Sequence, residues 1–189
     1  MNIVNLYTDG ACSGNQNKTN IGGWGAVLEY GLHKKELYGG EINTTNNRME
    51  MMALLSALQA MKREELTIRV FSDSSYLMDC FRQKWYLNWQ KNDWKTSKKT
   101  DVENKDLWMA LLSEAKKHSM SFFRVKGHVN LNSATVNADS HFAKFLQWNG
   151  SSFTRQDFFY ITEMNNRADA LANIAMDEIR ASLKETQSE

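Results

Sequence analysis

Three carboxylates stand where the surrounding sequence is apolar. Asp9 follows the strand-forming residues 3–8, and Asp73 comes just after the strand-forming residues 67–71. Glu50 is the only charge in a strongly helical, apolar run. Neighbouring carboxylates cannot all stay ionised without cations, and an all-oxygen cluster selects hard metals such as Mg²⁺ or Mn²⁺. Two such ions, about 3.5–4 Å apart, would form a site for phosphoryl transfer.

Each of these residues also has an ordinary structural interpretation. Asp9-Gly10 is a common turn dipeptide, so this stretch alone indicates only a strand followed by a turn. Glu50 could lie exposed in the first turn of its helix, where a negative charge complements the helix dipole. Buried and unpaired, the Glu50 carboxylate would be costly. The metal site becomes the stronger interpretation because two strands end in the same way.

The elements that would position these carboxylates form an α/β fold, a mixed sheet with helices packed on it. Further strands are expected at 24–30, 33–41, 67–71 and 121–125. Helices are expected at 49–61, 74–81, 84–91, 104–118 and 134–148, with a final one starting at Asn165. If the strands before Asp9 and Asp73 are parallel neighbours, the two carboxylates emerge side by side, and the helix carrying Glu50 can reach the same point.

Composition indicates one soluble globular domain. The chain has 189 residues, of which 42% are hydrophobic, and a net charge of +1. We expect a single domain over residues 1–182 and a frayed tail over 183–189. No apolar run is long enough for a membrane span, and no signal peptide is expected. Two cysteines make neither a disulfide framework nor a zinc pattern, so we expect a cytoplasmic protein. We also expect a monomer.

One segment is more basic than the whole chain. Between Arg82 and Lys105 there are seven basic and three acidic residues, together with three tryptophans. Such a segment gives salt-dependent affinity for nucleic acid. The tryptophans more often complete the apolar faces of helices than stack on bases, and we expect them in the core.

Five segments together resemble the type 1 ribonucleases H. They are TDGACSGN, TTNNRMEMMALLSAL, SDSSY, KGHVN and NNRADALANIA. The order and spacing agree from residue 3 to about 127 and again from 165 to 180. The resemblance implies a five-stranded mixed sheet, in the strand order 3-2-1-4-5, flanked by helices. It also implies an endoribonuclease that hydrolyses the RNA strand of RNA/DNA hybrids and leaves 5′-phosphate and 3′-hydroxyl ends.

The same resemblance assigns site residues. The catalytic residues would be Asp9, Glu50, Asp73, His128 and Asp169. The four carboxylates would hold two Mg²⁺ ions, for which Mn²⁺ could substitute, and His128 would assist proton transfer or product release. Asp169 is expected in the first turn of the last helix, where the dipole favours a negative charge. Contacts to the hybrid would come from Cys12, Asn15, Thr45, Asn46, Asn47, Trp85, Lys91, Lys95, Lys98 and Lys99.

The chain departs from the family pattern between His128 and Asp169, where many relatives are shorter. An insertion at about 130–164, with an extra helix and an aromatic-rich stretch, precedes the C-terminal helix. We hypothesise that it covers the rim of the site or widens the substrate groove. It also supplies a rival for the fourth carboxylate, Asp139, which lies nearer the usual spacing. We prefer Asp169 because NNRADALANIA matches the motif more fully.

Two other functions are compatible with this fold. A non-catalytic module could bind hybrids or a partner protein, but a scaffold gains nothing from clustered like charges. A nuclease or integrase acting on DNA could share the fold, but TTNNRME and KGH argue against it. Because the family pattern already begins at residue 3, no preceding hybrid-binding module is expected.

Overall fold

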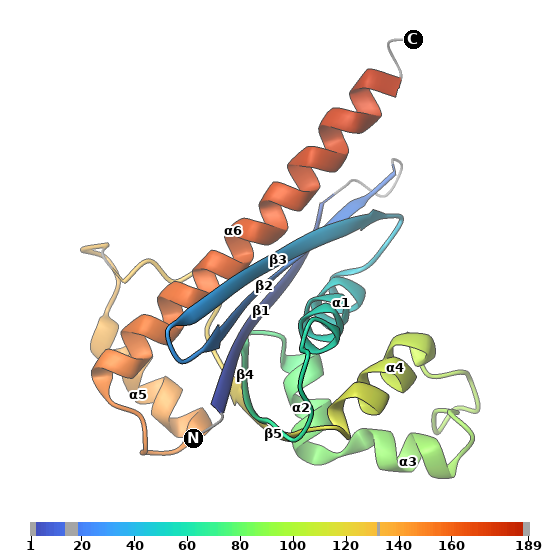
Figure 1. Ribbon diagram of the computed structural model, residues 1–189, viewed down its shortest axis with the longest axis horizontal. Coiled ribbons are helices and arrows are strands. Elements are labelled where there is room, and N and C mark those ends of the chain that lie inside the picture. Colours follow the sequence, from blue (N-terminus) through green and yellow to red (C-terminus); the bar gives the residue numbers. More distant parts are fainter. Residues whose placement is uncertain (1–2, 14–18, 132, 187–189) are drawn as a thin grey trace.

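The computed structural model describes residues 3–13, 19–131 and 133–186, and a five-stranded sheet forms its centre (Figure 1). The strands are β1 (Ile3–Ser13), β2 (Ile21–Tyr30), β3 (His33–Ile42), β4 (Thr67–Ser72) and β5 (Ser119–Arg124). Their order is β3-β2-β1-β4-β5, as the family resemblance implied. β1, β2 and β3 form an antiparallel meander, while β4 is parallel to both β1 and β5.

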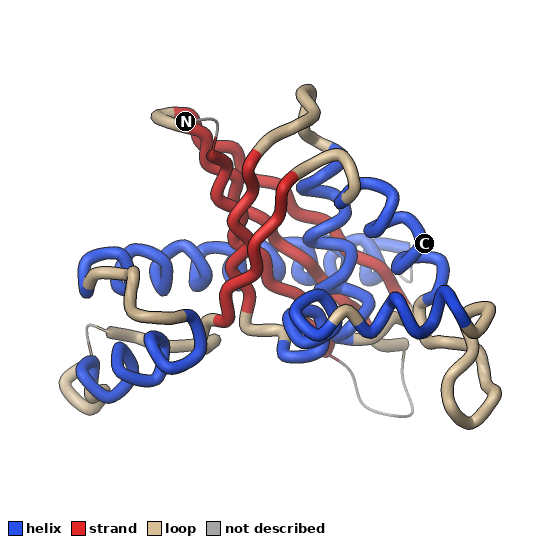
Figure 2. The backbone as a smooth tube through the Cα atoms, turned by 90° about the horizontal axis from the view of Figure 1, so that it is seen from below, coloured by secondary structure: helices blue, strands red, loops and turns tan. Residues whose placement is uncertain are grey.

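Helices cover both faces of the sheet (Figure 2). They are α1 (Asn46–Gln59), α2 (Ser75–Gln83), α3 (Trp85–Lys91), α4 (Lys105–Ala115), α5 (Ala138–Asn149) and α6 (Arg155–Thr186). α1, α2 and α4 pack on one face, and α5 and α6 pack on the other. None of the helices in the described ranges is both long and apolar enough to cross a membrane.

Alternation along the central strand explains why the sheet has a core on each side. Successive side chains of a strand point to opposite faces, so Leu6 joins the core under α1 and Tyr7 joins the core under α6. The second core includes three phenylalanines of the insertion, Phe145, Phe153 and Phe158. Burial of these rings explains why the insertion folds against the sheet.

The structure corrects the predicted end of the first strand. We expected β1 to stop at a turn on Asp9-Gly10, but it continues to Ser13 and pairs with β2 throughout. Only the parallel partner, β4, stops near this point, because the last β1–β4 pair is Thr8 with Ser72. Asp9 therefore lies within a strand, opposite Gly25 of β2.

The structure also corrects the last helix. α6 begins at Arg155, ten residues before the expected start at Asn165, and continues to Thr186, beyond the expected onset of fraying. Its cap is a reciprocal pair: the backbone N–H of Thr154 donates to Asp157 Oδ2 at 2.8 Å, and that of Asp157 donates to Thr154 Oγ1 at 3.1 Å. Asp169 is thus about four turns into the helix, not in its first turn.

Smaller differences affect other bounds. α5 starts at Ala138 instead of residue 134, because Asn137 is its N-cap and accepts a hydrogen bond from the Ser140 N–H at 3.0 Å. β2 starts three residues earlier than expected, at Ile21, because it pairs with the extended end of β1. These shifts leave the order of the elements unchanged.

Candidate functional site

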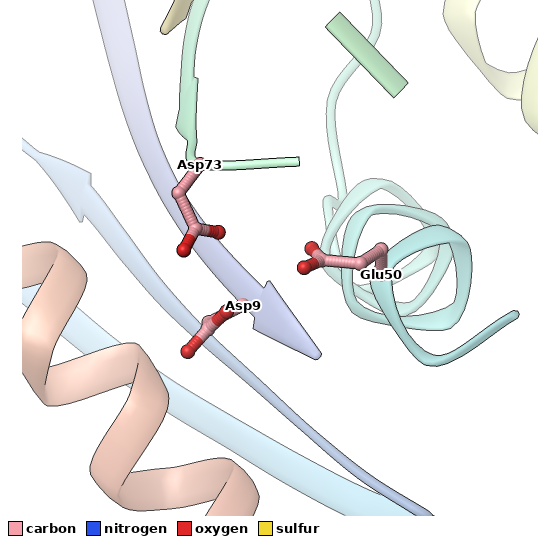
Figure 3. A group of neighbouring side chains, drawn as sticks. All are labelled: Asp9, Glu50 and Asp73. Atoms are coloured by element: carbon pink, nitrogen blue, oxygen red, sulfur yellow. The ribbon is translucent and has the colours of Figure 1, made fainter. Parts of the chain in front are cut away.

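The three carboxylates meet at one edge of the parallel part of the sheet. Asp9 and Asp73 are the next residues after the last parallel pair, so they emerge side by side from β1 and β4. Glu50 reaches them from the second turn of α1, and Figure 3 shows the three side chains pointing toward one another. One oxygen from each carboxylate lies within 4.8 Å of the other two.

A close approach between α1 and β1 makes this meeting possible. A Cβ atom at Gly10 would lie 2.3 Å from the backbone nitrogen of Glu50, so only glycine leaves room for the helix there. The N-terminus of α1 is fixed by Thr45, whose hydroxyl accepts from the Arg48 N–H at 3.2 Å. The Asp-Gly pair is therefore a packing feature of a strand, and not a turn.

Burial makes the cluster electrostatically costly. Asp9 is 4% exposed and Glu50 is 7% exposed. Burial first, and then the charges of Asp73 and Asp169, raise the pKa of Asp9 to about 8. Burial, followed by Asp9 and Asp73, raises the pKa of Glu50 well above its usual value. The Asp73 pKa is also raised, chiefly by burial.

Two oxygens of the cluster fit a divalent cation. Glu50 Oε2 and Asp73 Oδ1 are buried and have no hydrogen-bond partner among the described residues. Buried polar atoms are normally paired, so these two mark places where a ligand would complete the site. Hard carboxylate oxygens are the donors that Mg²⁺ and Mn²⁺ prefer.

Asp169 borders this triad from the opposite helix. α6 packs directly on β2, where a Cβ atom at Gly25 would lie 2.1 Å from the Ala168 carbonyl oxygen. Gly25 is the strand partner of Asp9, so Asp169 is carried to the Asp9 side chain, whose pKa it raises. His128, with an exposed ring and a positive φ of 55°, places Nδ1 3.6 Å from Asp169 Oδ2.

Asp139, the alternative fourth carboxylate, lies away from the triad. Asp139 lies in the first turn of α5, its side chain is 78% exposed, and it forms an ion pair with Arg155. It has no contact with the triad among the interactions of the described residues. Of the two candidates, the geometry brings only Asp169 to the cluster.

The small polar residues expected to contact substrate come from the end of β1 and the start of α1, the two elements that carry Asp9 and Glu50. Thr45 and Asn46 are exposed at the start of α1, Asn47 is half-buried, and Cys12 is half-buried near the end of β1. Thr45 also caps its helix, so its hydroxyl has a structural task. Asn15 lies outside the described residues.

The basic segment has its tryptophans in or against the core, as expected. Trp94 is 9% exposed, and Trp85 and Trp89 are half-buried against the same core. The Trp85 indole N–H donates to Gln83 at 3.0 Å. Of the four lysines expected to contact the hybrid, Lys91, Lys98 and Lys99 are exposed. Lys95 forms a 2.6 Å ion pair with Asp101.

One group of residues near the cluster was missed. Lys144 and Trp148 of α5 line a hollow that also includes Asp73 and His128. Apart from the rival carboxylate Asp139, the sequence analysis names no candidate site residue in the insertion. The sequence signal that could have found them is the four-residue spacing of Lys144 and Trp148, because residues four apart share one face of a helix.

Comparisons with known proteins bear on the family and the fold of this chain. The RNase H family model matches residues 1–145. A Ribonuclease H of Clostridium botulinum (strain Hall) is 42% identical over 178 residues, covering 94% of this chain and 98% of that protein. A Ribonuclease H of Syntrophomonas wolfei is 52% identical over 128 residues, covering 68% and 86%. The crystal structure of LC9-RNase H1, a type 1 RNase H with the type 2 active-site motif, has a TM-score of 0.68 at 24% identity, covering 93% of this chain and 72% of that chain.

These matches bear differently on the insertion and on the fourth carboxylate. The family match ends at residue 145, so its range includes Asp139 and leaves out Asp169. The C. botulinum match is too long to omit the insertion. The preference for Asp169 therefore rests on the geometry of α6, and not on the family match.

Proposed function

The chain belongs to the ribonuclease H family, and we propose that it is an endoribonuclease that hydrolyses the RNA strand of RNA/DNA hybrids with two Mg²⁺ ions. Mn²⁺ is expected to substitute, and the products carry 5′-phosphate and 3′-hydroxyl ends. The observation that carries the proposal is the buried triad, with carboxylate oxygens within 4.8 Å of one another.

Each carboxylate has a defined part in this proposal. Asp9, Glu50 and Asp73 are the ligands nearest one another, and Asp169 completes the set from α6. Bound divalent ions at such a site activate water and stabilise the leaving oxygen of an in-line displacement. His128, whose exposed ring places Nδ1 3.6 Å from Asp169 Oδ2, is assigned to assist proton transfer or product release.

Recognition of the hybrid is assigned to short polar side chains beside the cluster and to the basic segment. An RNA strand presents 2′-hydroxyls in a wide, shallow minor groove, which suits the short donors Cys12, Asn15, Asn46 and Asn47. Thr45 is proposed to contact a DNA phosphate. Further contacts are assigned to Trp85, Lys91, Lys95, Lys98 and Lys99, although the core contacts of Trp85 and the ion pair of Lys95 limit those two.

A non-catalytic binding module is the second candidate, and the burial of the triad argues against it. A scaffold without metal would gain stability from replacing Glu50, because the carboxylate is buried with one oxygen unpaired. Retention of four acids at this point is explained by the need for a cation site.

The direct test compares matched RNA/DNA, RNA/RNA and DNA/DNA duplexes in Mg²⁺, Mn²⁺ and EDTA. We expect cleavage of the hybrid alone, in the RNA strand, and only with a divalent ion. Cleavage that persists in EDTA would contradict the metal mechanism. Cleavage of all three duplexes would contradict the proposed specificity.

A further inference from the structure

A second feature borders the carboxylate triad on the side of the insertion. A cavity of about 250 Å³ lies between the end of β5 and α5. Its lining includes Asp73, Arg124, Lys126, His128, Lys144 and Trp148. Asp73 belongs to the triad, so the cavity opens directly beside the proposed site of hydrolysis. Lys144 and Trp148 come from the insertion, whose role the proposed function leaves unassigned.

The cavity is strongly cationic. Arg124, Lys126 and Lys144 line it, and Asp73 is the one acid among its lining residues. The Arg124 guanidinium lies 4.7 Å from the centre of the Trp148 ring, and the Lys144 ammonium lies 5.2 Å from the same centre. Trp148 thus gathers two like charges at one place through cation–π contacts. An anion in the cavity would relieve their repulsion.

Arg124 also has unused hydrogen-bonding capacity. Its Nε is buried and has no partner among the described residues. A guanidinium presents several donors in a fixed fork that matches a phosphate. Arg124 is therefore both charged and unsatisfied at the wall of a cavity that could hold such a group.

The insertion is fastened to β5 at this residue. The Asn149 amide accepts from the Arg124 N–H at 2.8 Å and donates to the Arg124 carbonyl at 2.8 Å. It also accepts from Arg82 Nη2 at 2.7 Å and donates to the Phe145 carbonyl at 3.0 Å. These bonds fix the end of α5, and so hold Trp148 and Lys144 beside the carboxyl end of the sheet.

We propose that this cavity, which we name the α5 pocket, binds a backbone phosphate of the RNA strand next to the phosphate that is cleaved. Lys144 and Arg124 provide the charge, and Trp148 positions them. The proposal rests on the proposed function, because it requires an RNA strand in the site. The RNA strand is chosen because the pocket shares Asp73 and His128 with the site of hydrolysis, so the cleaved strand is the nearest source of a phosphate.

The first test measures steady-state cleavage of an RNA/DNA hybrid by Lys144→Glu, Lys144→Ala and Trp148→Ala. We expect Lys144→Glu to raise KM about tenfold, with kcat changed less than about twofold, because an electrostatic contact outside the reacting atoms is lost. The slope of log KM against log salt concentration should also decrease by about one, the value expected for the loss of one phosphate contact. Trp148→Phe should restore most of the loss seen in Trp148→Ala, since phenylalanine retains a π face.

The matched control is Lys62→Glu, which makes the same charge change at an exposed lysine. Lys62 lies just beyond the C-terminal end of α1, whereas Glu50 lies near the N-terminal end of that helix. A KM for Lys144→Glu equal to that of Lys62→Glu would overturn the proposal. Failure of the wild-type protein to cleave hybrids would instead overturn the proposed function, so the two failures are distinguishable.

A second arm tests which strand occupies the pocket. Hybrids are prepared in which the RNA strand alone, or the DNA strand alone, is shortened stepwise toward the cleavage point. We expect the RNA truncation that removes the bound phosphate to raise the KM of the wild-type protein. The same truncation should change the KM of Lys144→Glu little, because the substitution has already removed that contact. The same non-additivity found only with DNA truncation would overturn the assignment to the RNA strand.

Discussion

At the scale of single residues, the site depends on the absence of side chains as much as on the acids. Gly10 lets the backbone of Glu50 approach β1, and Gly25 lets α6 bring Asp169 over Asp9. A Cβ atom at Gly127 would lie 1.9 Å from Asp73 Oδ2, so the backbone of the loop before His128 also packs closely against the cluster. Three glycines far apart in sequence thus determine how close four carboxylates come.

The choice between Asp169 and Asp139 can be tested directly at this scale. In Mg²⁺, Asp169→Asn should reduce hybrid cleavage by about 10²-fold or more, because it removes a charge beside Asp9. Asp139→Asn should retain cleavage within about twofold, since its side chain is exposed and pairs only with Arg155. Cleavage rates of the two purified variants decide the matter. Loss of cleavage in Asp139→Asn alone would show that the wrong carboxylate has been chosen.

Asp9 should also make the metal-free protein sensitive to pH. Its folded pKa is about 8, against 3.8 for an ordinary aspartate. The folded state therefore binds more protons than the unfolded state between these values, so stability falls as pH rises from about 4 to about 8. Asp9→Asn removes this loss and should exceed wild type by about 1 kcal/mol or more at pH 8.

Urea unfolding of both proteins in EDTA, from pH 5 to pH 9, measures this difference. The free-energy gap between Asp9→Asn and wild type should widen with pH and then level off above about pH 8. A gap that stays constant over this range would contradict a raised Asp9 pKa. Addition of Mg²⁺ should narrow the gap, because the ion stabilises only a folded state that can bind it.

At the scale of elements, the sequence predicted which segments exist better than where they end. The meander and the apolar helix that carries Glu50 were predicted because period-2 and period-3.6 patterns report burial locally. The strand order came from the family resemblance, and the sequence around Glu50 left open whether its carboxylate is buried or exposed. The end of β1 was not predicted correctly, because Asp-Gly is a common turn dipeptide and only the pairing with β2 shows that the strand continues past it.

The start of α6 was missed for a related reason. Asn165 and Asn166 have the composition of a helix cap, yet both lie within the helix. Asn165 is 1% exposed, and Asn166 donates to the Val129 carbonyl at 2.8 Å. A distant loop, and not the local sequence, satisfies that amide. The dipole argument for Asp169 was wrong as a result, while its place beside Asp9 follows from helix packing on Gly25.

The junction between α5 and β5 gives a prediction about elements. Asn149→Ala removes four hydrogen bonds, of which three link α5 to Arg124 and Arg82 and one is made to Phe145 within α5. It should destabilise the protein by about 1–3 kcal/mol, since partly buried backbone groups lose their partners. Denaturant unfolding provides the measurement. Asn92→Ala, at an exposed asparagine whose amide bonds only within its own helix end, should stay within about 0.5 kcal/mol of wild type. Equal effects of the two substitutions would show that Asn149 does not anchor the insertion.

At the scale of the whole molecule, the two faces of the sheet carry different elements of the proposed site. One face carries α1, α2 and α4 and the basic segment, and the other carries α6 and the insertion. The triad lies at the carboxyl end of the parallel strands, where a residue from each face can arrive. The layered fold followed from sequence patterns, but the place of the insertion did not. Its aromatic residues indicate burial without indicating which surface they cover.

The central claim is that Asp9, within the buried triad, is indispensable for metal-dependent cleavage of the RNA strand. The most direct measurement is hybrid cleavage in Mg²⁺ by wild type and by Asp9→Asn, with folding of both checked by circular dichroism. We predict that Asp9→Asn is folded and has lost at least about 10³-fold in rate. A folded Asp9→Asn protein that cleaves within about tenfold of the wild-type rate would contradict this account.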